Sequence, residues 1–117
     1  MREIKFRAWN VSTKEWLDED FSVSNDGKIL YMGEEESYDV PSEFILMQFT
    51  GLHSKSGKEI WEGDVVNLGG EVNFGVYYHS AQAGFYLKDK RKGMSLSILE
   101  TRGEVIGDIW ENPKLLK

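Results

Sequence analysis

The feature that most constrains this chain is the alternation of apolar and polar residues in short runs. The segment Glu71–His79 reads EVNFGVYYH, and an apolar residue occupies every second position. Arg2–Trp9 shows the same period. This period places successive side chains on opposite faces of a strand. Turn signals separate the runs at roughly the eight-to-twelve-residue spacing of small β-proteins, and no segment has a convincing helical period. The pattern therefore predicts a mainly β protein, either a small barrel or a sandwich.

The runs also suggest where strands begin and end. We expect strands at Arg2–Trp9, Phe44–Thr50, Lys58–Trp61, Val65–Leu68, Glu71–His79, Gly84–Leu87 and Glu104–Trp110. Phe44–Thr50 is densely apolar, which is typical of a strand buried on both faces. Gly69-Gly70 predicts a two-residue hairpin. The charged segment Gly33–Glu43 precedes the expected division into an N-terminal β-hairpin subdomain (1–48) and a C-terminal subdomain (49–117).

Composition narrows the class of protein. The 117 residues include no cysteine, which excludes disulfides and cysteine-based zinc sites. No apolar run approaches the roughly 18 residues that span a bilayer, and the first residues lack the apolar stretch of a secretory signal. We therefore expect a soluble cytoplasmic protein with no membrane partner.

The excess of negative over positive charge lies in the first part of the chain. The net charge is −6; residues 1–50 carry five Lys/Arg against eleven Asp/Glu, and residues 51–117 carry nine of each. An acidic chain is a poor general binder of phosphate backbones, so nucleic-acid binding would require a local basic patch. The acidic residues serve either solubility or recognition, and the sequence leaves both open.

The densest set of turn signals lies in Phe49–Val66, FTGLHSKSGKEIWEGDVV. Gly51, Gly57 and Gly63 are suited to the positive φ of tight turns, and Gly51 is expected to end the preceding strand. Asp64 is expected to accept a hydrogen bond from the backbone where the next strand starts. These residues predict joints of the β-fold.

Functional interpretations of the same stretch are weaker. Glu62 and Asp64 could act as a carboxylate pair, but a hard cation requires more oxygen ligands from a shaped loop. The Lys-Ser-Gly-Lys string lacks both the spacing of a phosphate-binding loop and a following helix. The two histidines, His53 and His79, have no cysteine partner, and HSAQAG is not the elbow that presents a nucleophilic serine. We expect no enzymatic activity, no cofactor and no metal site.

One basic run is a candidate for nucleic-acid binding. KDKRK contributes Lys88, Lys90, Arg91 and Lys92. Nearby aromatic residues, on which bases could stack, are Tyr77, Tyr78, Phe85 and Tyr86. The alternative is a solvated hairpin tip whose charge prevents edge pairing.

Two tryptophans are candidates for protein binding. Trp9 and Trp110 fall on the more polar faces of their expected strands, and exposed tryptophan is favoured at the centre of protein interfaces. The alternative is that both are core residues, since each buries on the order of 200 Å².

Three stretches together resemble a known family. They are MREIKFRAW at Met1–Trp9, the FTGLHSKSGKEIWEGDVV string, and EVIGDIWENPKLL at Glu104–Leu116. In this order they resemble the YopX family of bacteriophage and prophage proteins. Trp61 and Trp110 stand where that family usually has Tyr, and Asp108 stands where it usually has Asn.

The resemblance implies a fold more than an activity. It implies an SH3-type barrel in the C-terminal half, an N-terminal β subdomain and a phage or prophage origin, and it supplies no catalytic residues. We expect a non-catalytic accessory protein that binds an unidentified host or phage protein or assembles with itself. The alternative is a small-barrel nucleic-acid binder that uses Lys88, Lys90, Arg91 and Lys92.

Overall fold

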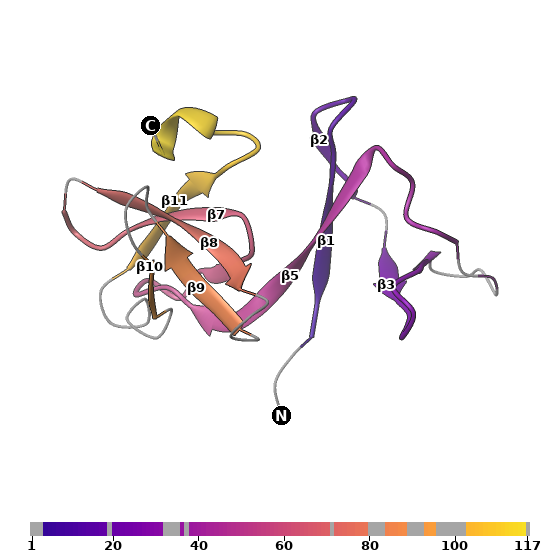
Figure 1. The fold of residues 1–117 in the computed structure, drawn as a ribbon, viewed down its shortest axis with the longest axis horizontal. Helices are drawn as coiled ribbons and strands as arrows, with labels where there is room; N and C mark the ends of the chain where they lie inside the picture. Colours follow the sequence, from indigo (N-terminus) through magenta and orange to yellow (C-terminus); the bar gives the residue numbers. More distant parts are fainter. Residues whose placement is uncertain are drawn as a thin grey trace. The chain divides into compact units, whose positions relative to one another are not determined.

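A computed structural model describes residues 4–18, 20–31, 36, 38–70, 72–79, 84–88, 93–95 and 103–116 of the chain (Figure 1). The chain folds into two compact units, which we call the N-terminal unit, Ile4–Gln48, and the C-terminal unit, Phe49–Lys117. The boundary falls inside one long strand. The described elements are almost all antiparallel strands, so the prediction of a mainly β protein is confirmed.

The N-terminal unit is built from short antiparallel strands. These are β1 (Phe6–Asn10), β2 (Glu15–Trp16), β3 (Phe21–Val23), β4 (Ile29–Tyr31) and the first part of β5 (Phe44–His53). β1 pairs with β2 on one side and with β5 on the other, and β3 pairs with β4. The β1–β2 turn forms because the Asn10 side chain accepts hydrogen bonds from the backbone N–H groups of Ser12 (2.9 Å) and Thr13 (3.0 Å). An Asx turn of this kind is a usual role for asparagine.

The long strand β5 differs from the expectation at Gly51. Gly51 does not end the strand; it has φ of 86° at an irregularity between the pairs Phe49–Trp61 and His53–Glu59, and β5 continues to His53. The Thr50 hydroxyl donates to the Ile60 carbonyl (2.7 Å) and accepts from Leu52 N–H (3.2 Å). A side chain thus replaces ladder hydrogen bonds at a bulge, which is why the strand bends without stopping.

The C-terminal unit contains a five-stranded sheet. Its strands are β7 (Asp64–Asn67), β8 (Asn73–His79), β9 (Gly84–Lys88), β10 (Gly93–Ser95) and β11 (Glu104–Asp108), in the order β10-β9-β8-β7-β11. β6 (Glu59–Trp61) pairs with the end of β5. The meander β7–β8–β9 places consecutive strands side by side, and the last strand closes against the first strand of the meander.

One apolar cluster forms the core of the C-terminal unit. Its buried members are Ile60, Val66, Phe74, Val76 and Leu87. Phe74 and Val76 come from one face of the alternating segment, as the period predicts, while Tyr78 at the end of β8 is 47% exposed. Burial of each such side chain contributes about 1.5–3 kcal/mol, so this cluster accounts for much of the stability of the unit.

Two connections differ from the sequence-based expectation. β7 and β8 are last paired at Asn67–Asn73, so the connection is longer than the predicted two-residue hairpin. The Asn67 side chain holds it by accepting from Gly69 N–H (2.7 Å) and donating to Asn73 Oδ1 (3.0 Å). The last strand stops at Asp108, where a turn leads into a short 3-10 helix, η3 (Pro113–Leu116).

Candidate functional site

The outward face of the β8–β9 hairpin carries the candidate site. Alternate residues of the two strands point away from the core, because successive side chains of a strand lie on opposite faces. Tyr77 and Tyr86 are paired across the hairpin, and His79 and Lys88 lie two residues further along their strands on the same face. We call Tyr77, His79, Tyr86 and Lys88 the aromatic–lysine face.

The rings of this face contact one another. The ring centroids of Tyr77 and Tyr86 are 6.5 Å apart, and His79 lies 6.0 Å from Tyr77 and 5.9 Å from Tyr86. The three rings are tilted or edge-on, which is the preferred geometry for aromatic pairs. All three side chains are half-buried, so part of the surface of each remains accessible.

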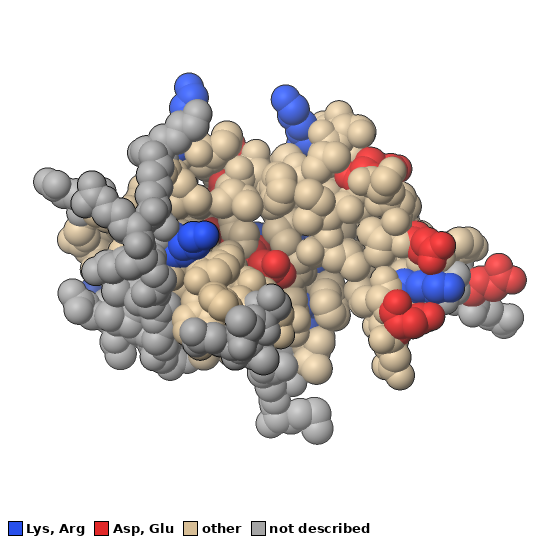
Figure 2. Space-filling view, viewed as in Figure 1, with Lys and Arg blue, Asp and Glu red and all other residues tan. Residues whose placement is uncertain are grey.

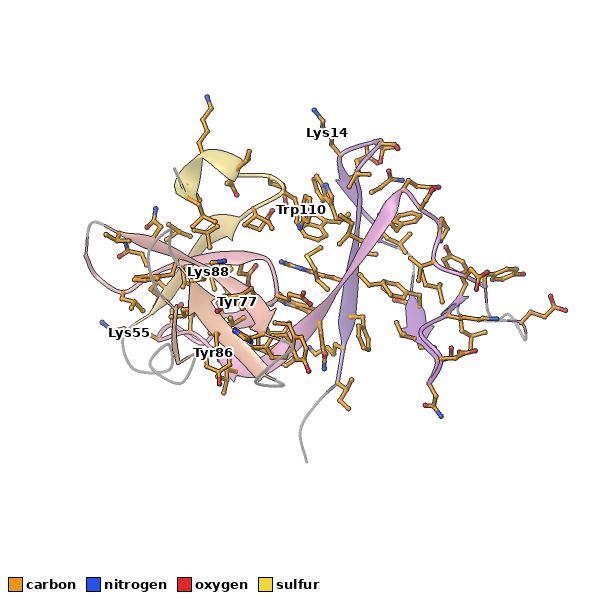
Figure 3. The ribbon with its side chains drawn as sticks, viewed as in Figure 1. Lys14, Lys55, Tyr77, Tyr86, Lys88 and Trp110 are labelled. Carbon is orange, nitrogen blue, oxygen red and sulfur yellow. The ribbon has the colours of Figure 1, made fainter. Side chains whose placement is uncertain are left out.

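A cation completes the face. The Lys88 ammonium nitrogen lies 5.6 Å from the centre of the Tyr77 ring, and Lys88 itself is exposed (Figure 3). Such a cation–π contact contributes about 0.5–1 kcal/mol at an exposed site. The ammonium group is therefore held beside the aromatic surface while it remains accessible to a ligand.

His79 adds an unpaired polar atom. Its Nδ1 is buried and has no hydrogen-bond partner within the part of the chain that the structure describes. Ser80, the serine that follows His79 in the HSAQAG stretch, lies outside the described residues. The other histidine, His53, packs on Phe49 with centroids 5.7 Å apart. Across the described residues no group of three or more His, Cys, Asp or Glu residues could hold a metal ion.

The aromatic residues named from the sequence do not form one surface. Tyr78 and Phe85 are also paired across the hairpin, with centroids 5.4 Å apart, but they lie on the opposite face from Tyr77 and Tyr86. Sequence reasoning included Tyr77 and Tyr86 and missed His79 as their neighbour. The period-two signal would have found it, because Tyr77 and His79 have the same parity along β8.

Of the four basic candidates, Lys88 is placed at the end of β9. Lys90, Arg91 and Lys92 lie outside the described residues. Lys88 itself pairs with Gly93 of the antiparallel strand β10.

The two candidate tryptophans do not form an outward pair. Trp9 is only 5% exposed and packs edge-on against Trp16, with centroids 4.9 Å apart, so of the two alternatives the core position holds for Trp9. The physical reason is that Trp16 and the Arg7 guanidinium, 4.4 Å from the Trp16 ring centre, build an aromatic layer on the face that looks polar in the sequence. Trp110 is half-buried and lies in the turn after β11, where its backbone N–H donates to Asp108 Oδ1 (2.9 Å).

The turn residues have structural partners. Gly57 and Gly63 have φ of 92° and 89°. Asp64 is 3% exposed, and its carboxylate accepts a hydrogen bond from the backbone N–H of Trp61 at 2.7 Å. The Ser54–Lys58 turn is tied to β11 because Ser56 Oγ donates to the Glu104 carboxylate at 2.7 Å. The polar groups of these turn residues therefore form hydrogen bonds that stabilise the fold.

The comparison with protein families decides the membership of the chain. The family model described as "YopX protein" matches residues 5–117 of this chain. The chain belongs to the YopX family. This YopX-family chain is also similar to the crystal structure of protein EF1440 from Enterococcus faecalis, with 27% sequence identity, full coverage of both chains and a TM-score of 0.69. A search of curated proteins finds no match. Among the residues that the structure describes, no helix has the length and apolar character needed to cross a membrane.

Proposed function

We propose that this YopX-family chain is a phage- or prophage-encoded accessory protein of the bacterial cytoplasm that binds a ligand without catalysing a reaction. Its C-terminal unit is an SH3-type barrel, an assignment supported by the β7–β8–β9 meander with β11 beside β7. The non-catalytic role is supported by the structural use of Asp64, Ser54, Ser56 and Glu104, whose polar groups hold turns and strands.

The ligand that fits the aromatic–lysine face is a single-stranded nucleic acid. The observation that carries this proposal is the placement of the Lys88 ammonium beside the paired rings of Tyr77 and Tyr86. Single strands are bound by aromatic rings on which bases stack and by cations that follow the phosphates. Residues 51–117 carry equal numbers of acidic and basic residues, so this part of the chain adds no net repulsion of a phosphate backbone.

The test is binding of a fluorescein-labelled oligothymidylate, followed by fluorescence anisotropy. The double variant Tyr77→Leu/Tyr86→Leu removes both stacking surfaces and keeps apolar bulk. We expect at least a tenfold weaker affinity, since stacking contributes about 1–3 kcal/mol per base. The matched control is Tyr78→Leu, which removes a tyrosine that is 47% exposed on the opposite face. Equal loss in control and double variant, with both folded by circular dichroism, would contradict the proposal.

A protein partner or self-assembly is the second candidate function. It is favoured by Trp110, which is half-buried in a turn, and by Ile106, which is 43% exposed on the edge strand β11. Exposed apolar residues on an edge strand can pair with another chain. Sedimentation velocity tests self-assembly: Ile106→Lys should leave a concentration-dependent oligomer monomeric, while a monomer at all concentrations would reject this candidate.

A further inference from the structure

A hollow in the N-terminal unit is lined by side chains that suit a cation. Its lining residues are Ile29, Tyr31, Tyr38, Asp39 and Pro41, and its volume is about 460 Å³. The rings of Tyr31 and Tyr38 are 6.4 Å apart and inclined at 48°. Tyr38 is 46% exposed, so the hollow is open to solvent.

The walls of this hollow are fixed by the backbone. Tyr38 and Ile29 exchange two backbone hydrogen bonds, Ile29 N–H to Tyr38 O (2.8 Å) and Tyr38 N–H to Ile29 O (2.7 Å). Ile29 is fully buried and anchors β4 in the unit. Tyr38 is therefore held beside β4 before any ligand arrives, and a preorganised wall lowers the entropic cost of binding.

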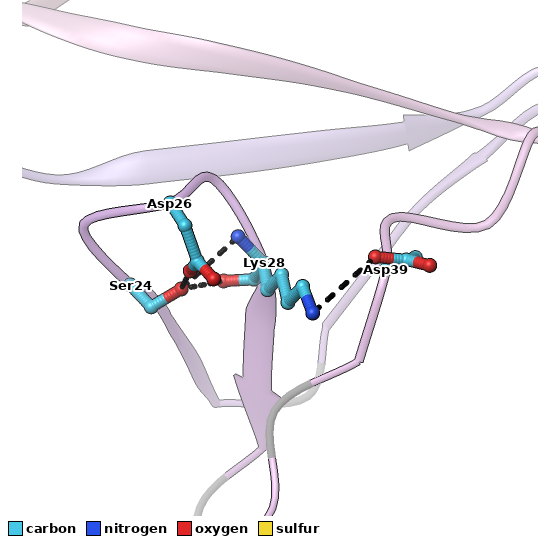
Figure 4. A network of polar contacts seen from close by, with 4 residues as sticks. All are labelled: Ser24, Asp26, Lys28 and Asp39. Atoms are coloured by element: carbon cyan, nitrogen blue, oxygen red, sulfur yellow. Dashed lines mark hydrogen bonds and ion pairs between the residues drawn. The ribbon is translucent and has the colours of Figure 1, made fainter.

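A carboxylate that already attracts a cation lies at the rim. Asp39 has a 92% exposed side chain, and one of its carboxylate oxygens lies 3.8 Å from the Lys28 ammonium (Figure 4). An exposed pair of this kind contributes little to stability, so it can exchange for an incoming cation at small cost. Figure 2 shows acidic side chains grouped around a basic one on this unit, and residues 1–50 carry an excess of acidic residues.

We propose that the Tyr31–Tyr38 hollow binds an arginine side chain presented by a basic segment of a protein partner. A guanidinium is planar and stacks on aromatic rings, and its two N–H edges match a carboxylate such as that of Asp39. The negative charge of the unit complements a basic segment and would attract it at low salt. This site lies in a different unit from the aromatic–lysine face and stands independently of the function proposed for that face.

The test uses two short peptides in an NMR titration of the full chain. The probe is acetyl-Gly-Ser-Arg-Ser-Gly-amide, and its control carries citrulline, the neutral isostere of arginine, at the same position. We expect the arginine peptide to shift the amide signals of Tyr31, Tyr38 and Asp39, and the citrulline peptide to bind at least about fivefold more weakly. Equal shifts from both peptides, or shifts confined to other residues, would overturn the proposal.

Three variants assign the effect to the hollow. Asp39→Asn should weaken arginine-peptide binding several-fold, while Asp20→Asn, an exposed carboxylate in the same unit, should leave it unchanged. Lys28→Gln should strengthen binding, because it removes the internal cation that competes for Asp39. Unchanged binding in Asp39→Asn, or weaker binding in a folded Lys28→Gln, would contradict the assignment.

Discussion

At Gly107 the structure leaves no space for a larger residue. A Cβ there would lie 2.5 Å from Asn112 Oδ1 and 2.8 Å from Leu115 Cδ1. The same Asn112 oxygen accepts the Asp108 N–H at 3.2 Å, so it cannot move without losing that bond. We expect Gly107→Ala to lower the free energy of unfolding by about 1–3 kcal/mol, measured by urea denaturation.

Gly70→Ala is the matched control for this prediction. Among the residues that the structure describes, and leaving aside its neighbours in the chain, no atom lies within 4 Å of the position where the Cβ would be, and Gly70 is not among the positive-φ residues. We expect its free energy of unfolding to stay within about 0.5 kcal/mol of the parent chain. Equal effects of the two substitutions would show that the contacts with Asn112 and Leu115 do not restrict Gly107.

Asp64 is predicted to be a structural carboxylate. Its side chain is buried and accepts the Trp61 N–H, so Asp64→Ala should leave that donor without its acceptor and cost about 1–3 kcal/mol of unfolding free energy. Asp64→Asn keeps one acceptor oxygen and should cost less. Urea denaturation of both variants measures the difference, and an unaltered stability of Asp64→Ala would refute the assignment.

Asp26 makes a small contribution that depends on pH. The Ser24 hydroxyl donates to the Asp26 carboxylate, and this hydrogen bond holds the pKa of Asp26 below its ordinary value (Figure 4). A pKa lowered by folding gives stability that is present above the ordinary pKa and is lost as the pH falls through the lowered pKa. Ser24→Ala should raise the pKa of Asp26, as measured by NMR titration of the carboxyl carbon; an unchanged pKa would exclude Ser24 as the cause.

At the scale of elements, the bulge in β5 shows why the glycine signal was misread. Gly51 has the positive φ of a turn, but the Thr50 hydroxyl bonds to Ile60 on the neighbouring strand and continues the pairing. Ile60 lies ten residues from Thr50 in the chain, so the residues next to Gly51 do not indicate this hydrogen bond. Thr50→Val should remove these bonds and lower the unfolding free energy by about 1–3 kcal/mol in urea denaturation; no loss would show that the hydroxyl does not support the bulge.

The β8–β9 hairpin shows which structural features the sequence could predict and which it could not. The alternation in Glu71–His79 correctly predicted a strand with Phe74 and Val76 in the core. Alternation alone could not place Tyr77 opposite Tyr86, because that register depends on the length and shape of the connection. The sequence therefore supplied Tyr77, Tyr86 and Lys88, but neither His79 as their neighbour nor the grouping of the rings on one face.

In strand β1, the charged residues on one face gave a misleading indication that this face is exposed to solvent. Its face with Lys5, Arg7 and Trp9 looks polar, and this polarity made an outward Trp9 one of the two alternatives. In the structure Arg7 lies over Trp16 and Trp9 packs against the same ring. Arginine can cover apolar surface with its stem and stack its guanidinium, so an arginine does not mark a solvent face reliably.

At the scale of the whole molecule, the two units carry different charge. Residues 1–50 are acidic, and residues 51–117 are balanced, with Lys88 beside the tyrosines of β8 and β9. We infer that the units contact ligands of opposite charge, a basic protein segment at the Tyr31–Tyr38 hollow and a nucleic-acid strand at the aromatic–lysine face. High salt should weaken both interactions, because both depend on charge.

The most direct test of the central claim is the salt dependence of oligothymidylate binding in three proteins: the parent chain, Lys88→Gln and Lys55→Gln. Lys55 is exposed in the Ser54–Lys58 turn of the same unit, so both substitutions remove one positive charge from that unit (Figure 3). If Lys88 contacts a phosphate, its loss should reduce the slope of log K against log salt by about 0.7, and the Lys55 variant should keep the parent slope. Equal slopes in all three proteins, or no binding by the parent chain at low salt, would contradict the proposed binding face.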